Sequence, residues 1–138
     1  MTASIDTNIL LRLIKADVPD QAEIAERLLC DQDNPVTVDI QALIEAVFAL
    51  EHHYGLTREQ CALMMTTTLE LPTLVGDHAA FRAALTSWVS HPKLSLSDCY
   101  LAERAQATGC LPLWTFDRKL ASQHPAARLA LATDTMQE

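Results

Sequence analysis

The stretch ASIDTNILL, residues 3–11, contains a short apolar run, an acidic residue and a second apolar run. The first run predicts a short strand. Asp6 then predicts the N-cap of the following helical segment, because an aspartate side chain accepts hydrogen bonds from the free amides at a helix start. Short apolar runs alternate with helical patterns along the rest of the chain. This alternation predicts an α/β fold with a mostly parallel sheet.

About five short strands are predicted, with helices between them. Strands are expected at residues 3–5, 35–38, 71–75, 111–116 and 129–133. Helical segments are expected at residues 9–14, 21–30, 39–53, 77–90, 95–109 and 117–122, and another begins at 57. Thr57 and Gln60 predict a capping box at the start of that helix. Since no repeat, linker or change of composition divides the pattern, residues 1–138 are predicted to form a single domain.

The composition limits the functional class. The 138 residues include 10 basic and 18 acidic side chains, a formal net charge of −8. Nucleic-acid-binding proteins usually carry a basic face, so this balance disfavours phosphate binding unless a bound cation reverses the local field. Hydrophobic residues make up 49% of the chain, which excludes a disordered polymer. We expect neither a membrane span nor a secretory signal, and hence a cytoplasmic protein with no membrane partner.

Four acidic residues stand at positions that call for an explanation. Asp6 and Asp117 directly follow predicted strands, and Asp98 lies in the first turn of a predicted helix. Helix capping explains each of these three separately, and Ser95 with Asp98 resembles a capping box. Glu45 is the one charge in the apolar stretch ALIEAVFAL, residues 42–50. It is expected either to be buried with a cation or strong donors, or to reach water at the least covered edge of its helix.

Together the four acids favour a metal site. In open parallel sheets, ligands bind beyond the carboxyl ends of the strands, and residues that follow strands gather there. Several carboxylates in close contact repel one another unless they are protonated or bind a cation. Sites built from oxygen atoms suit Mg²⁺ or Mn²⁺. Such a site supports hydrolysis of phosphodiester bonds by metal-activated water.

Four segments resemble the signature of the PIN-domain ribonucleases, specifically the VapC-type toxins of toxin–antitoxin pairs. They are IDTNIL at 5–10, IEAVFALE at 44–51 with YGL at 54–56, SDCYLA at 97–102 and TFDRKL at 115–120. The order and spacing of these segments cover essentially the whole chain.

The resemblance implies a three-layer α/β/α sandwich with a central, mostly parallel sheet of about five strands. It also implies a metal-dependent endoribonuclease. Its metal-binding and catalytic residues would be Asp6, Glu45, Asp98 and Asp117, with Mg²⁺ or Mn²⁺ as cofactor. Asn8 and Thr115 would support them.

The same resemblance implies an RNA substrate, a homodimer and a cognate VapB-like antitoxin. Many relatives carry a further acid two places after the last aspartate, where this chain has Lys119. That departure argues against a complete second metal site.

Other polar residues are predicted to have structural roles. His52 and His53 point about 100° apart on a helix, so they do not readily share one ion. The four cysteines form no C-x-x-C pair and are expected to be reduced and partly buried. The aromatic residues expected in the core are Phe81, Trp88, Trp114 and Phe116. The basic residues expected either at a solvated face or at RNA phosphates are Arg12, Lys15, Arg118 and Lys119.

Rival functions remain open at this level. A haloacid-dehalogenase-like phosphatase would use Asp6 as a nucleophile, but Asn8 stands where its second acid would act. A receiver-like signalling module would need paired acids after the first strand, which this chain lacks there. The remaining alternatives are a PIN nuclease of RNA processing that is not a toxin, and a PIN fold that only binds.

Overall fold

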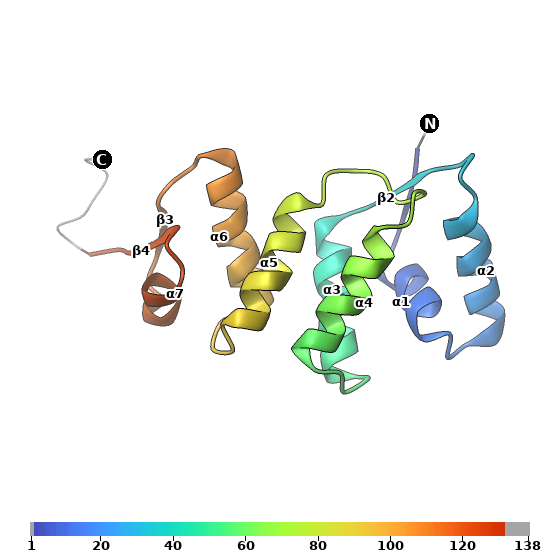
Figure 1. Ribbon diagram of the computed structural model, residues 1–138, viewed down its shortest axis with the longest axis horizontal. Helices are drawn as coiled ribbons and strands as arrows, with labels where there is room; N and C mark the ends of the chain where they lie inside the picture. The colour runs from blue at the N-terminus through green and yellow to red at the C-terminus, as the bar shows by residue number, and fades with distance from the viewer. Residues whose placement is uncertain (1, 132–138) are drawn as a thin grey trace. The chain divides into compact units, whose positions relative to one another are not determined.

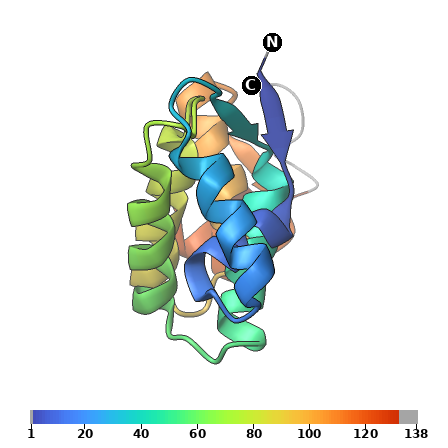
Figure 2. The ribbon, with the colours of Figure 1, turned by 90° about the vertical axis from the view of Figure 1, so that its right-hand side faces the viewer.

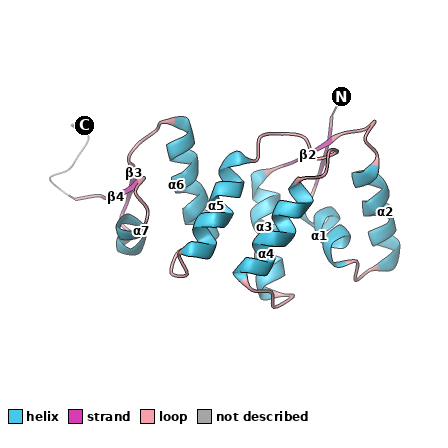
Figure 3. Ribbon diagram, viewed as in Figure 1, coloured by secondary structure: helices cyan, strands magenta, loops and turns pink. Residues whose placement is uncertain are grey.

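The computed structural model describes residues 2–131, and within them the chain divides into two compact units. The N-terminal unit is Met1–His78 and the C-terminal unit is Ala79–Glu138. Helices make up most of both units, and the strands are short (Figure 3). The α/β class is therefore confirmed. None of the described helices is long and apolar enough to cross a membrane.

The N-terminal unit pairs two parallel strands beside four helices. The strands are β1 (Ala3–Ile5) and β2 (Val36–Val38), and the helices are α1 (Thr7–Lys15), α2 (Pro19–Cys30), α3 (Ile40–His52) and α4 (Arg58–Leu69). Figure 2 shows β1 and β2 side by side. Residues that are fully buried among these helices include Leu10, Leu29, Leu43, Leu50 and Met65. Burying a leucine side chain stabilises a fold by about 1.5–3 kcal/mol, so these residues hold the unit together.

The C-terminal unit also contains one parallel strand pair. Its elements are α5 (Ala79–Ser90), α6 (Leu96–Thr108), β3 (Leu113–Thr115), α7 (Arg118–Gln123) and β4 (Ala127–Leu129), which Figure 1 colours from yellow to red. Phe81 and Trp88 are buried as predicted. Trp114 is half-buried, whereas Phe116 is 85% exposed, so the prediction of Phe116 as a core residue is wrong. Phe116 lies after the end of β3, where the strand pair no longer covers it.

The predicted sheet of about five strands is not found in the described residues. Instead, β1 pairs with β2 and β3 pairs with β4 as two separate two-stranded sheets. The strand expected at residues 71–75 is reduced to a single parallel bridge between Val36 and Leu74. The last strand is Ala127–Leu129, two residues earlier than predicted, and residues 132–133 of the expected strand lie outside the described residues.

Capping residues explain where the helices begin. The Thr57 hydroxyl and the Gln60 side chain form the reciprocal capping box predicted for α4. Asp39 caps α3 by accepting a hydrogen bond from the Gln41 amide. Gly109, at φ +73, ends α6 in the left-handed conformation that glycine adopts without strain. Local sequence signals therefore determine these helix ends.

Candidate functional site

Asp6 is held by the helix that it starts. It directly follows β1, and its Oδ1 accepts a hydrogen bond of 3.2 Å from the Ile9 amide of α1. The residue is exposed, and no hydrogen bond from residues 2–131 reaches its Oδ2. Capping thus uses one carboxylate oxygen and leaves the other available to a ligand.

Glu45 is exposed, which is one of the two environments expected from the sequence. Helix α3 turns Leu43, Ala46 and Val47 into the core and leaves Glu45 on its outer side. Thr7 Oγ1 donates to Glu45 Oε2 at 3.1 Å. Gln41 Nε2 donates to Glu45 Oε1 at 3.4 Å. Glu45 is therefore tied to the residue that follows Asp6, and the structure brings these two acids to the same end of α1.

Asp98 lies in the first turn of α6, and Ser95 is the N-cap. The Ser95 hydroxyl accepts a hydrogen bond of 3.1 Å from the Asp98 amide. The reciprocal half of a capping box is missing, because the Asp98 carboxylate makes no hydrogen bond within the described residues. The side chain is half-buried and lies near the N-terminal end of the helix. Leu101, three residues later in the same helix, is 53% exposed.

Asp117 is the N-cap of α7, as Asp6 is of α1. Its Oδ1 accepts hydrogen bonds from the amides of Lys119 at 2.9 Å and Leu120 at 3.2 Å. Thr115 Oγ1 accepts a hydrogen bond of 2.9 Å from the Asp117 amide. Thr115 therefore has a contact that orients Asp117, whereas the Asn8 side chain, which is exposed, has no hydrogen bond to residues 2–131.

The donor set of these four acids fits a hard divalent cation, because every candidate ligand is an oxygen atom. Within residues 2–131, no three or more His, Cys, Asp or Glu side chains form a cluster that could hold a metal ion. Asp6 and Glu45 lie in the N-terminal unit, and Asp98 and Asp117 lie in the C-terminal unit. Each unit thus supplies two of the four carboxylates.

The basic residues that follow Asp6 in the chain, Arg12 and Lys15, contact other side chains of the N-terminal unit. Arg12 Nε donates to Gln21 Oε1 at 2.8 Å, and Arg12 Nη1 lies 3.6 Å from Asp17 Oδ1. Lys15 Nζ lies 5.3 Å from the centre of the Tyr54 ring. Tyr54 also donates to Asp17 at 2.8 Å, and this bond lowers the pKa of Asp17 and raises the pKa of Tyr54. Arg12 and Lys15 thus take part in a network that joins α1 to the turn after α3.

The basic residues beside the last acidic segment are differently placed. Arg118 and Lys119 begin α7 directly after Asp117, and both are exposed. They are the cationic side chains that lie nearest to Asp117 in the sequence. These two are therefore the better candidates to contact phosphates.

His52 and His124 contact neighbouring side chains and backbone. His52 Nε2 lies 3.2 Å from Glu51 Oε1, and the His52 ring lies 4.2 Å from the Phe48 ring. His124, for which no role was predicted, is 4% exposed. Its Nδ1 accepts a hydrogen bond from the Ala126 amide, and its Nε2 lies 3.1 Å from Glu103 Oε1. His124 therefore links α6 to the segment between α7 and β4.

The cysteine residues are free thiols, as expected. Cys61 and Cys99 are buried, whereas Cys30 and Cys110 are exposed. Burial raises the pKa of the Cys61 thiol to about 11. None of them lies beside one of the four acids in a metal-binding cluster of the described chain.

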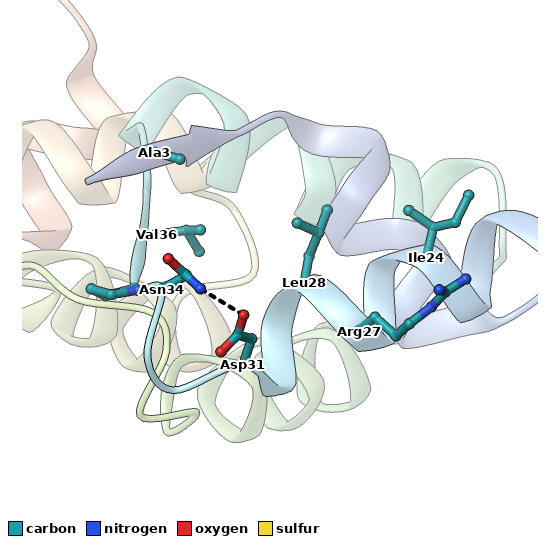
Figure 4. A pocket seen from close by; sticks show the side chains of 8 residues that line it. Ala3, Ile24, Arg27, Leu28, Asp31, Asn34 and Val36 are labelled. Carbon is teal, nitrogen blue, oxygen red and sulfur yellow. Dashed lines mark hydrogen bonds between the residues drawn. The ribbon is translucent and has the colours of Figure 1, made fainter. Parts of the chain in front are cut away.

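A hollow of about 450 Å³ lies in the N-terminal unit, and neither Asp6 nor Glu45 lines it. Ile24 and Leu28 of α2 form its apolar wall, and Asp31 and Asn34 form its polar side (Figure 4). Asn34 Nδ2 donates to Asp31 Oδ2 at 2.8 Å, so these two polar groups satisfy each other. Since neither Asp6 nor Glu45 lines the hollow, it is not part of the acidic site.

Thr7 is the residue of this site that sequence reasoning missed. Its hydroxyl contact with Glu45 joins residues that are far apart in the chain, so no local pattern reveals it. Its position directly after Asp6 was the one available signal. Thr115 also lies close in sequence to one of the acids, two residues before Asp117. Its supporting role was expected from the resemblance to PIN-domain ribonucleases.

Comparison with protein families identifies the chain. A model described as "PIN domain" matches residues 3–123, which include all four acids and parts of both units. PIN domains are typically nucleases, and they generally bind RNA and use divalent metals. No curated protein and no solved structure gives a significant match. Because the matched region covers most of its length, this chain belongs to the PIN domain family.

Proposed function

We propose that this PIN domain protein is a metal-dependent endoribonuclease, the VapC-type toxin of a toxin–antitoxin pair. Its membership of a family of nucleases supports a phosphodiester as the substrate bond. In this proposal both units act together as one PIN domain over residues 1–138, since the family match extends across both.

The proposed metal ligands are Asp6, Glu45, Asp98 and Asp117, with Asn8 and Thr115 in support, and the cation is Mg²⁺ or Mn²⁺. The observation that carries this proposal is that capping leaves part of each aspartate unused. Asp6 and Asp117 each use only Oδ1 as a cap, and the Asp98 carboxylate has no hydrogen-bond partner within residues 2–131. A carboxylate oxygen that no protein donor occupies can coordinate a hard divalent cation.

The chain's own groups orient these ligands. The amides at the starts of α1 and α7 fix Oδ1 of Asp6 and of Asp117, so each side chain is restricted before any ligand binds. The Thr115 hydroxyl orients the backbone of Asp117. A divalent cation bound there supplies charge stabilisation for the phosphodiester and activates water. Arg118 and Lys119, both exposed, would contact phosphates of the RNA on either side of the cleaved bond.

The partners in this proposal come from the VapC-type resemblance. A cognate VapB-like antitoxin would silence the nuclease, and the toxin would be a cytoplasmic homodimer. Lys119 stands where many such toxins carry a further acid, which favours a single cation per site.

A cleavage assay tests the nuclease activity. The full chain should cut RNA with Mg²⁺ or Mn²⁺ and stop cutting when EDTA is added. Cleavage that persists in EDTA would contradict a metal-dependent mechanism. A phospho-aspartate at Asp6 after incubation with phosphate esters would instead favour the phosphatase alternative.

Growth measurements test the toxin role. Expression of the protein should arrest growth, and co-expression of a short protein encoded by an adjacent reading frame should relieve the arrest. RNA cleavage in vitro without growth arrest would favour the alternative, a PIN nuclease of RNA processing.

A further inference from the structure

We propose that Thr7 is a positioning residue that holds the Glu45 carboxylate ready for cation binding beside Asp6. This inference rests on the proposed metal site and adds to it a residue outside the acidic quartet. Thr7 is the first residue of α1, and Asp6, the cap of the same helix, directly precedes it. Any restraint that Thr7 places on Glu45 therefore also sets the position of Glu45 relative to Asp6.

The Thr7 hydroxyl has two acceptors within reach. Its Oγ1 lies 3.1 Å from Glu45 Oε2 and 3.3 Å from the carbonyl oxygen of Ala42. A hydroxyl group has one proton, and a hydrogen bond to an ionised carboxylate is stronger than one to a neutral carbonyl. The proton is therefore directed to Glu45 when that side chain is charged.

The two hydrogen-bond donors to Glu45 belong to different helices, so they restrain its carboxylate relative to different parts of the unit. Gln41 lies one turn earlier in α3, so its 3.4 Å contact with Oε1 fixes Glu45 only relative to its own helix. Thr7 belongs to α1, and it makes the one hydrogen bond within residues 2–131 that joins the Glu45 side chain to another element. Thr7 is thus the contact that relates the carboxylate of α3 to the start of α1.

This arrangement prepares Glu45 for a ligand. A free glutamate side chain must be ordered when it binds a cation, and a carboxylate already held by donors needs less ordering. Residues that orient metal ligands typically change metal affinity by about 10–100-fold when they are replaced. Thr7 uses one lone pair of Oε2, and the remaining lone pairs of the carboxylate stay available to a cation.

Thr7→Val tests the inference, because valine keeps the shape of threonine and removes the hydroxyl group. Mn²⁺ binding to the full chain should weaken by about 10–100-fold in Thr7→Val and remain near the wild-type value in Thr7→Ser. Thr37→Val is the matched control. Its hydroxyl lies in the same unit and donates to a backbone carbonyl, that of Ala3, at 3.4 Å. This control should bind Mn²⁺ like the wild type.

Thermal unfolding in EDTA separates positioning from a structural role. If Thr7 only stabilises the fold, Thr7→Val lowers the unfolding temperature and still binds Mn²⁺ like the wild type, which overturns the inference. If Thr7→Val does not fold, Thr7→Ala and Thr7→Ser are compared instead. Weaker binding by the alanine variant alone supports the inference, and equal binding overturns it.

Glu45→Gln distinguishes failure of this inference from failure of the proposed function. If the wild type and Glu45→Gln bind Mn²⁺ equally, or neither binds, the proposed metal site is wrong and the role of Thr7 is wrong with it. If Glu45→Gln loses affinity while Thr7→Val keeps it, the metal site stands and only the role of Thr7 is wrong.

Discussion

Asp6 in the N-terminal unit and Asp117 in the C-terminal unit occupy equivalent local positions. Each lies just after a three-residue parallel strand and caps the following helix through Oδ1. The surroundings of the second acid differ between the units. Glu45 has donors from Thr7 and Gln41, whereas Asp98 has no side-chain hydrogen bond within residues 2–131. The same local pattern, a strand followed by a capping aspartate, thus positions Asp6 and Asp117. The contacts of Glu45 and Asp98 depend instead on the tertiary structure around each residue.

Replacing Asp6 or Asp117 tests whether the two residues have equivalent roles. It should have the largest effect on RNA cleavage. Asp6→Asn and Asp117→Asn keep a capping side chain but lose the charge, so both should lower Mg²⁺-dependent RNA cleavage by about 100-fold or more without unfolding the protein. Asp39→Asn is the matched control, because Asp39 also caps a helix, by accepting from the Gln41 amide at 2.9 Å. Equal loss of cleavage in all three variants would mean that capping, not metal binding, explains the effect.

The four capping positions show how much the sequence could predict. The helix starts at Asp6, Asp39, Thr57 and Asp117 were all predicted, because capping depends on residues that are two or three apart. The exposure of Glu45 and its contact with Thr7 could not be predicted, since they depend on how α1 packs against α3. The strand expected at residues 71–75 forms only one parallel bridge, between Val36 and Leu74, because an apolar run does not determine how far the backbone pairing extends.

The two units also differ in whether a buried polar side chain has hydrogen-bond partners. In the C-terminal unit, His124 has a partner for each ring nitrogen. His124→Ala should lower the free energy of unfolding by about 2–3 kcal/mol, because it leaves a cavity and an unpaired Ala126 amide. Urea denaturation measures this loss. His53→Ala, at an exposed position, should change it by less than about 0.5 kcal/mol; similar values for both variants would rule out a structural role for the His124 network.

In the N-terminal unit the buried hydroxyl of Thr73 has no hydrogen-bond partner among residues 2–131, and the side chain is 1% exposed. Thr73→Val should therefore raise the free energy of unfolding by about 1 kcal/mol. Thr68→Val is the control, since the buried Thr68 hydroxyl donates to the Met64 carbonyl at 2.7 Å. Stabilisation by both replacements would show that added apolar surface, not removal of an unpaired group, is responsible.

Labelling of the cysteine thiols should follow the same pattern in both units. Of the changes considered, it should disturb the fold least. Each unit has one exposed and one buried cysteine: Cys30 and Cys61 in the first, Cys110 and Cys99 in the second. At pH 8 an aromatic disulfide reagent should label Cys30 and Cys110 rapidly. Cys61 should resist labelling, because it is buried and its raised pKa, about 11, keeps it protonated. Rapid labelling of Cys61 in the native protein would show that the N-terminal unit opens readily.

Mn²⁺ titration of the full chain tests most directly whether both units supply ligands to one cation. The account predicts that Asp6→Asn, Glu45→Gln, Asp98→Asn and Asp117→Asn each weaken binding at least about tenfold, and that Asp39→Asn binds like the wild type. If Asp98→Asn and Asp117→Asn bind Mn²⁺ as tightly as the wild type, the C-terminal unit contributes no ligand, and the four-carboxylate site is contradicted.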